Sequence, residues 1–537
     1  MTRPQRFIIT SAQKKYAFAL LCVLALFMPF ALQLIPWFEW TDGCEHAAAI
    51  RELTYSLFHP LNPYLNLPGN TSPRFVPSIV IMAVAAKILR CDVFIMLGFF
   101  SVAAFLFLGL GIYQFAKEYF QDEDQPVYTL LSLLFLWGIG WDGANSIMFR
   151  ALVYNAYYPS VISLILVFYA LTALLKYLRQ SRPRYFVEFA VLSSLLFLNH
   201  QPTGFLFFFL SFLLVATEGY LNKQNALLFL GAFVLAVMVT AWWPYYSFFK
   251  GVLFMLAGKG KQFPDYQFGH HLHYSGHLLK IGPCFLGMIT IAYLGIKKQY
   301  PFIVVGFITS FVFYILGYFF AIILFERLIF LCVLFSQLAF SRMLKNILYG
   351  TPDFVAGKRK QLVQSVYVAA LVVGIFTQFY LIGTVYMPQY IELQPQVRIK
   401  PFEHPLKKYI ALRHTLQRGD IVITDVLTSW ALPCVTDVKV ISLFHNSPFV
   451  LENFERLHDT RIFFNSPADR QRIVAKYNIS HILVNKRKIS GSNYSEENGL
   501  ICPDKDWMHS LGRLGKVVIN NEDFFLVELK KAAAMKG

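Results

Sequence analysis

Four ionisable side chains gather in the first polar stretch of the chain, between residues 40 and 74: Asp42, Glu45, His46 and Glu52. A carboxylate can take a proton from an attacking acceptor group, so Asp42 and Glu45 are candidate general bases. They share one face if a helix starts near Gly43, because residues three apart are neighbours on a helix. Ionisable groups at the mouth of a membrane-embedded bundle are costly and are usually functional. We therefore expect this stretch to be an active-site loop.

The composition indicates a polytopic membrane protein. Of the 537 residues, 56% are hydrophobic and 17% aromatic, with a mean hydropathy of +0.50, whereas a soluble domain has roughly 45–50% apolar residues. The net charge of +17 fits Lys and Arg in cytoplasmic loops better than a nucleic-acid partner. The seven Cys form no C-x-x-C pair and no zinc spacing, so the sequence signals no structural metal. We expect no cofactor, and a divalent metal stays open as an alternative that the sequence does not signal.

The hydrophobic runs predict about eleven spans. Basic residues precede the run 16–38, which is too long for a cleaved signal, so the N-terminus is expected inside and the loop 39–75 outside. The short run 76–89 is interpreted as a re-entrant or interfacial helix, because only then do the later basic tracts fall inside. The other runs lie at about 93–116, 127–141, 159–178, 185–198, 203–219, 226–246, 281–296, 301–319, 320–340 and 365–387.

Under this topology the polar and charged residues near the ends of the hydrophobic runs lie at the outer side of the bundle. They are Asp142, Asn145, His200, Glu326 and Arg327. Such convergence on one face suits a site built between helices at a membrane surface. The histidines of the segment 247–280 have no carboxylate at metal spacing, so they are interpreted as part of an interfacial loop.

After residue 387 the chain becomes more polar and lacks a further hydrophobic span. D-I-V-I-T-D, D-V-K-V-I-S and S-H-I-L-V-N are typical of strands, and N-S-P-A-D-R-Q-R-I-V-A-K-Y predicts a capped helix. The end of the chain predicts a hairpin around Asn520 and Asn521. Residues 388–537 are therefore expected to form a soluble, extracytoplasmic α/β domain, after a transmembrane domain spanning residues 1–387.

Several short motifs together resemble the GT-C superfamily of integral-membrane glycosyltransferases, and bacterial members in particular. They are an acidic residue just past the first span, the loop motifs P-L-N-P-Y-L and S-P-R-F-V-P, a His after a mid-bundle span, a late Glu-Arg, and the terminal patterns I-V-I-T-D and Y-N-I-S-H-I-L-V. The resemblance covers nearly the whole chain. The adjacent acidic pair common in the family is absent, since Asp42 and Glu45 are three residues apart.

The resemblance implies a polyprenyl-phosphate-sugar donor, a saccharide, lipid or protein acceptor on the outer face of a bacterial inner membrane, and inversion at the sugar. It implies Asp42 as the base, with Glu45 beside it. Arg327 is expected to bind the donor phosphate, because a guanidinium matches phosphate geometry, and Glu326 to orient a neighbour. The expected accessory or acceptor-binding residues are His46, His200, Asp142 and Asn145.

Plainer readings stay open for the same residues. Asp42 can be a helix cap, Glu326 and Arg327 a structural ion pair, and His200 a group that caps a turn. At the level of the whole chain, the alternatives are a lipid or solute transporter and a non-catalytic assembly protein whose α/β domain binds a partner. A transporter is expected to carry charged residues near the midplane rather than at the mouth.

Overall fold

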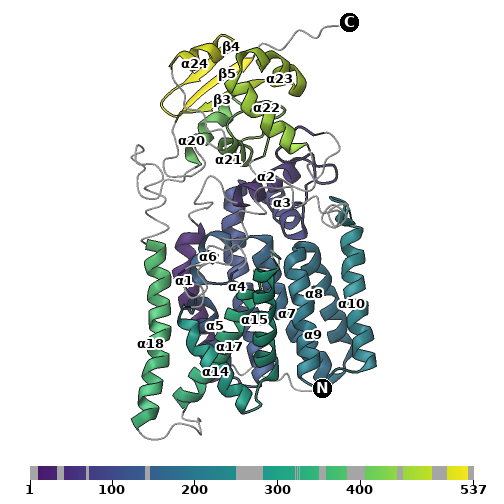
Figure 1. Ribbon diagram of the computed structural model, residues 1–537, viewed down its shortest axis with the longest axis vertical. Helices are drawn as coiled ribbons and strands as arrows, with labels where there is room; N and C mark the ends of the chain where they lie inside the picture. Colours follow the sequence, from purple (N-terminus) through teal and green to yellow (C-terminus); the bar gives the residue numbers. More distant parts are fainter. Residues whose placement is uncertain are drawn as a thin grey trace, which may run out of the picture. The chain divides into compact units, whose positions relative to one another are not determined.

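The computed structural model describes residues 10–32, 42–67, 72–139, 146–249, 282–320, 322, 325, 327–349, 358–383, 406–443, 452–486 and 505–529. The chain divides into two compact units (Figure 1). Unit 1 comprises Met1–Leu32, Phe99–Trp243 and Tyr266–Val385, and unit 2 comprises Gln33–Gly98, Pro244–Asp265 and Tyr386–Gly537.

Unit 1 is a helical bundle. Its elements are α1 (Ser11–Leu32), most of α4 (Val93–Phe120), α5 (Gln125–Phe135), α6 (Phe149–Asn155), α7 (Pro159–Gln180), α8 (Pro183–Asn199), α9 (Gln201–Thr217), α10 (Lys223–Ala241), η2 (Gly282–Cys284), α14 (Phe285–Ile296), α15 (Pro301–Phe319), α17 (Leu328–Tyr349) and α18 (Lys358–Leu381). Within the described residues, 7 helices are long and apolar enough to cross a membrane: α1, α4, α7, α10, α15, α17 and α18. The protein is thus mostly helical, with a small sheet.

The predicted span 320–340 differs from the helix that the structure has there. The hydrophobic run 320–340 predicted a span, whereas α17 covers Leu328–Tyr349. The helix continues past the apolar run because its last turns carry Arg342 and Lys345, and both pair with Asp122, at 2.8 and 2.7 Å. A prediction based on apolar residues ends the span before these two charged residues. The ion pairs with Asp122 compensate their charges, so the helix can continue through them.

Basic residues from distant parts of the sequence meet at one end of unit 1. Lys15, at the start of α1, pairs with Asp124 at 3.3 Å, and Arg179, at the end of α7, pairs with Glu118 at 2.9 Å. Arg342 joins the same end through Asp122, which follows α4. The start of the first helix and the basic ends of α7 and α17 therefore lie at the same end of this unit.

Unit 2 contains a five-stranded sheet in the order β2-β1-β3-β5-β4. The strands are β1 (Ile421–Ile423), β2 (Lys439–Val440), β3 (His481–Asn485), β4 (Gly515–Asn520) and β5 (Phe524–Leu529). β1 pairs in parallel with β2 and β3, whereas β5 is antiparallel to β3 and β4. The antiparallel pair β4–β5 confirms the hairpin predicted around Asn520 and Asn521.

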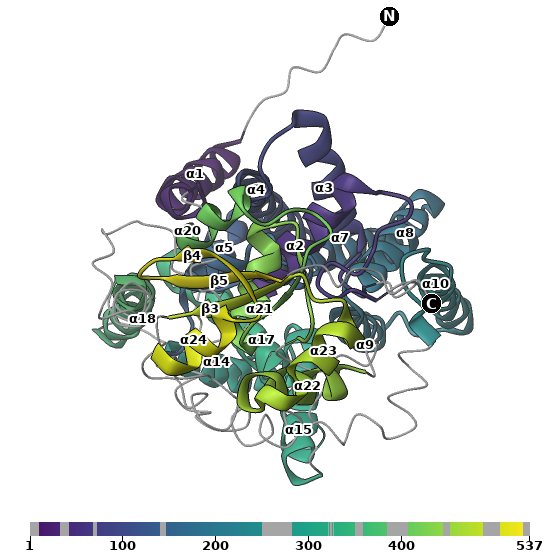
Figure 2. The same ribbon diagram turned by 90° about the horizontal axis from the view of Figure 1, so that it is seen from above.

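Helices cover both faces of this sheet, as the view from above shows (Figure 2). Because side chains alternate along a strand, Phe525 and Val527 of β5 face one core. Phe524 instead contacts Tyr409 on the other face, with ring centroids 5.2 Å apart. The first core is covered by α22 (Asn453–Asn465), α23 (Arg470–Tyr477) and α24 (Lys505–Gly512). The other helical elements of this domain are α20 (Lys407–Ile410), η4 (Ala411–His414), α21 (Val426–Val435) and η5 (Pro467–Asp469).

Two helices from the first polar loop belong to the same unit. They are α2 (Asp42–Tyr55), which packs against α21, and α3 (Pro77–Leu89), which packs against α2. The loop between them adds to the sheet, because Leu65 forms a parallel bridge with Val440 of β2. Residues from the start and the end of the chain are therefore built into one compact structure.

Candidate functional site

The acidic residues predicted to carry the chemistry lie in the first turn of α2. The helix begins at Asp42, as expected for a start near Gly43, and both Asp42 and Glu45 are in its first turn. Carboxylates are favourable there because the N-terminal end of a helix carries a partial positive charge. Three consecutive alanines, Ala47–Ala49, favour the helix and are buried, so the first turn projects from a well-packed helix.

Arg74 links the two carboxylates. Its Nε lies 2.5 Å from Glu45 Oε2, and a terminal guanidinium nitrogen lies 3.6 Å from Asp42 Oδ1. The Glu45 side chain is 9% exposed, whereas that of Asp42 is 42% exposed. Of the two, Asp42 is thus the more accessible carboxylate, and Glu45 is the one held most firmly by the cation.

The segment that carries Arg74 is itself fixed. The backbone N–H of Arg74 donates to Ser72 Oγ at 3.2 Å, and the adjacent Phe75 packs edge-on against Tyr245, with centroids 5.9 Å apart. Tyr245 in turn donates to the Leu57 carbonyl at 2.7 Å, just after α2. These contacts therefore hold in place the loop that carries the Arg74 guanidinium, next to the start of α2.

Tyr64, from the P-L-N-P-Y-L motif, lies near the same turn. Burial raises the pKa of its hydroxyl well above the usual value, and the nearby Cys44, Cys434 and Glu45 raise it further. Tyr64 therefore stays protonated and donates to the Trp430 carbonyl at 2.9 Å. The hydroxyl serves as a structural donor rather than an acid that ionises near neutral pH.

The remaining predicted site residues have different locations. His46 is buried in α2, at 3% exposure. His200 precedes α9, where its Nδ1 accepts the Thr203 N–H at 3.3 Å and lies 2.7 Å from Thr203 Oγ1, so it caps this helix. Asp142, Asn145 and Glu326 lie outside the described residues.

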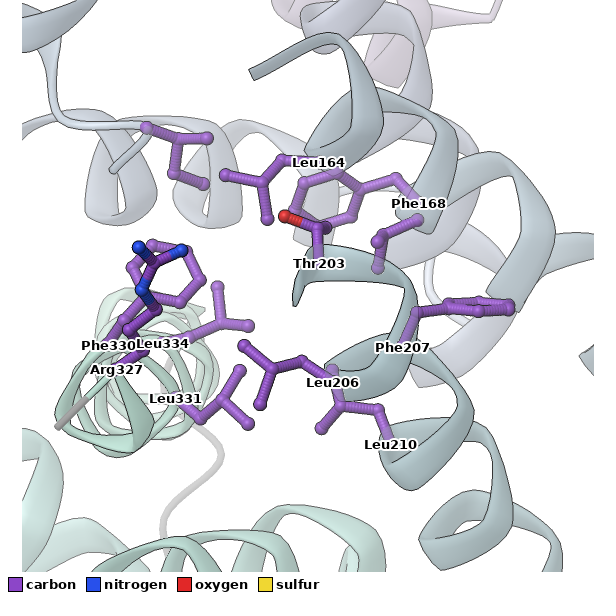
Figure 3. A pocket seen from close by; sticks show the side chains of 12 residues that line it. Leu164, Phe168, Thr203, Leu206, Phe207, Leu210, Arg327, Phe330, Leu331 and Leu334 are labelled. Atoms are coloured by element: carbon purple, nitrogen blue, oxygen red, sulfur yellow. The ribbon is translucent and has the colours of Figure 1, made fainter. Parts of the chain in front are cut away.

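Arg327 borders a pocket within unit 1 (Figure 3). The residue immediately precedes α17 and its backbone carbonyl accepts the Phe330 N–H at 3.1 Å. The pocket is partly open to solvent, and α6, α7, α9 and α17 or their flanking residues supply its walls. Its lining residues are Ile147, Leu164, Val167, Phe168, Thr203, Leu206, Phe207, Leu210, Arg327, Phe330, Leu331 and Leu334.

The lining of this pocket is almost entirely apolar. Apart from Arg327 and Thr203, every lining side chain is a hydrocarbon, and Figure 3 shows these two among leucine and phenylalanine side chains. A guanidinium beside the first turn of a 22-residue helix combines two features that favour an anion, the fixed positive charge and the helix N-terminus. The lining of this pocket therefore favours apolar groups and, at Arg327, an anionic group.

Arg74 supplies one positive charge to the two carboxylates of α2, Asp42 and Glu45. Within the part of the chain that the structure describes, no group of three or more His, Cys, Asp or Glu side chains could hold a metal ion.

Two contributors to these sites were missed by the sequence interpretation, Arg74 and Thr203. Arg74 stands in the quoted motif S-P-R-F-V-P, but nothing in its spacing indicates that it returns to the start of α2. Thr203 follows a His-Gln-Pro helix start, which is the sequence of a cap as much as of a binding site. His200 holds Thr203 at the pocket wall, which gives the cap a connection to the pocket.

No protein-family model and no curated protein matches the sequence. Similar solved structures include the apo oligosaccharyltransferase of Archaeoglobus fulgidus, with 13% identity and a TM-score of 0.48, covering 87% of this chain and 69% of that chain. The same enzyme tethered with an acceptor peptide containing the NVT sequon has 14% identity, a TM-score of 0.48 and the same coverage. At these identities and TM-scores the likeness carries no conclusion about the activity of this chain.

Proposed function

We propose that the protein is a membrane glycosyltransferase that transfers a sugar from a polyprenyl-phosphate donor to an extracytoplasmic glycan, lipid or protein acceptor, with inversion. The observation that carries the proposal is the pocket beside Arg327. A polyprenyl-phosphate has a long hydrocarbon body and one anionic end, which match the apolar walls and the single guanidinium of this pocket.

The proposed reaction is a direct displacement at the anomeric carbon. The Asp42 carboxylate takes the proton of the acceptor nucleophile as the new glycosidic bond forms and the bond to the carrier phosphate breaks. Glu45, held by Arg74, orients the turn that carries Asp42. The phosphate leaves with the bonding electron pair, and Arg327 stabilises the charge that develops on it.

The proposed topology places the charged helix ends described above in the cytoplasm. Basic residues gather where α1 begins, as the positive-inside tendency requires. The model of eleven spans keeps α3 as an interfacial or re-entrant helix. Its 13 residues extend about 20 Å at 1.5 Å per residue, which is short of a roughly 30 Å hydrocarbon core.

The outer surface of α3 suits this location. One side packs in unit 2 through Ile79 and Met82, whereas Ile81, Ile88 and Leu89 are 58%, 73% and 65% exposed. An apolar surface of this kind is expected to lie against lipid. We keep the proposed division into a transmembrane domain, residues 1–387, and an extracytoplasmic α/β domain, residues 388–537, of a bacterial inner-membrane protein.

A reconstituted transfer assay tests the proposed function. Purified protein in liposomes is given a radiolabelled polyprenyl-phosphate-sugar and a mixture of glycan, lipid and peptide acceptors. We expect label to leave the carrier and appear in one acceptor class, and Arg327→Ala to abolish this. Label that crosses the bilayer with its carrier intact indicates a transporter, and a carrier that is neither cleaved nor moved indicates an assembly protein.

A further inference from the structure

The second half of α2 is held by a buried carboxylate, Glu52, which is 6% exposed. Glu52 follows Glu45 by seven residues (52 minus 45), close to two helical turns, so both lie on nearly the same side of α2, about 10 Å apart along its axis. Glu52 Oε2 lies 2.8 Å from Lys439 Nζ. Its Oε1 accepts the Leu61 N–H at 3.1 Å and lies 3.6 Å from an Arg418 guanidinium nitrogen.

Lys439 is part of the sheet, because it forms β2 with Val440. Its ammonium group also donates to the Asn62 carbonyl at 2.5 Å, in the loop that follows α2. The Asn62 side chain accepts the Leu65 N–H at 2.9 Å, and Leu65 bridges to Val440. One lysine therefore joins the sheet, the loop and the helix.

Glu52 favours the charged form of the Lys439 ammonium group. Burial lowers the pKa of Lys439, and the carboxylate of Glu52 opposes that shift. A buried carboxylate that loses its cation is strongly destabilised, so the contact is stable only with both members present.

Polar side chains of α2 also bond to α21 and to the residues that follow it. Arg51 Nε donates to the Cys434 carbonyl at 3.3 Å, at the end of α21, and Tyr55 donates to Asp437 at 2.7 Å. The Arg418 guanidinium stacks on the Tyr55 ring, 4.1 Å from its centroid. Figure 1 shows α2 beside α21. The helix that begins with Asp42 is thus bonded along its second half to the α/β domain.

We propose that Lys439 and Arg418 of the α/β domain are positioning residues for the transfer reaction, which fix α2 through Glu52 and thereby set the location of Asp42 and Glu45. The inference rests on the proposed function for its catalytic readout and on the contacts of unit 2 for its structural readout. Neither residue contacts a substrate. They act through a helix, which transmits a displacement at one end to the other, and a misplacement of about 1 Å can lower a rate about 100-fold.

The test compares two lysines of the same α/β domain. Lys439→Met removes the cation at Glu52, Lys439→Arg retains a cation, and Lys476→Met removes a cation that pairs with Asp459 at 2.6 Å. We expect Lys439→Met to lower kcat about 10- to 100-fold with little change in the KM for donor, and Lys439→Arg to recover most of it. Lys476→Met should leave kcat within about twofold.

Hydrogen exchange supplies the readout that does not depend on activity. In Lys439→Met, the amides of residues 42–55 should lose protection about tenfold or more, while they stay protected in Lys476→Met. Equal protection of α2 in Lys439→Met and wild type overturns the proposal, as does an equal loss of kcat in both Met variants. If Lys439→Met does not accumulate, Glu52→Gln retains the side-chain shape without the charge, and wild-type kcat and protection in that variant overturn the proposal. A wild-type protein without transfer activity refutes the proposed function, and the exchange data still decide on the position of α2.

Discussion

Arg74 is predicted to stabilise the acidic turn of α2 mainly through Glu45. Arg74→Met keeps an unbranched side chain of similar length but removes the cation from both carboxylates. The pair with Asp42 is 3.6 Å long and well exposed on the Asp42 side, so it contributes less than about 1 kcal/mol. The pair with Glu45 is 2.5 Å long and nearly buried on the Glu45 side, and such a charge-assisted hydrogen bond contributes about 1.5–3 kcal/mol.

The sum predicts a loss of about 1.5–4 kcal/mol of unfolding free energy for Arg74→Met. Thermal unfolding of the purified protein, followed by a fluorescent label in unit 2, should show a Tm lower by about 3–16 °C, at 2–4 °C per kcal/mol for a domain of this size. Arg74→Lys should lose about half as much, because it keeps the charge without the planar fork. Arg90→Met is the matched control, since Arg90 lies in the same unit and is exposed.

A double-mutant cycle shows which carboxylate accounts for the stability that Arg74 contributes. Glu45→Gln removes the buried charge, so it should recover part of the stability lost in Arg74→Met, with a coupling of about 1.5–3 kcal/mol. Asp42→Asn should couple to Arg74→Met by less than about 1 kcal/mol. An Arg74→Met protein as stable as wild type refutes the reasoning, and so does a stronger coupling to Asp42 than to Glu45.

The other predictions concern the pocket, the topology and pH. Arg327→Lys should weaken donor binding about tenfold and Arg327→Ala about 10- to 100-fold, measured with a fluorescent polyprenyl phosphate; unchanged affinity in Arg327→Ala assigns the residue to structure. A topology reporter inserted at Ser181 should be inside and one fused after Gly537 outside, and a cytoplasmic C-terminus overturns the span count. Burial lowers the pKa of His481 despite Asp420 nearby, so the folded α/β domain binds fewer protons than the unfolded chain. Stability should therefore fall as pH drops below about 6.5, and His481→Gln should flatten the pH profile of Tm; an unchanged slope contradicts this.

The local parts of this structure could be predicted from the sequence. The polar stretch D-G-C-E-H-A-A-A has helix-forming residues and acidic residues in its first turn, and α2 does begin at Asp42. The hairpin followed from two apolar runs around Asn520 and Asn521. Both are features of short segments, where periodicity and turn residues carry the information.

The partners of the acidic residues could not be predicted in this way. Arg74 reaches Glu45 across 29 residues, and Lys439 reaches Glu52 across 387. Contacts between residues so far apart in the sequence depend on how the helices and strands pack. Neither the periodicity of hydrophobic residues nor the spacing of charged residues predicts them. The pocket beside Arg327 has the same origin, because α7, α9 and α17 come together to form its walls. The helix α17 was predicted to start too early, since the apolar residues before Glu326 and Arg327 were counted as part of the same span.

The claim that Asp42 is the general base is tested most directly by comparing the turnover of Asp42→Asn with that of Asp42→Ala. A positioned base contributes roughly 10²–10⁴-fold, so Asp42→Asn, which keeps the shape but cannot accept the proton, should lower kcat by about that factor with donor binding nearly unchanged. Glu45→Gln should lower kcat less. If Asp42 only caps α2, Asn serves as well as Asp, and Asp42→Asn then turns over at the wild-type rate while only Asp42→Ala is impaired. That result contradicts the account.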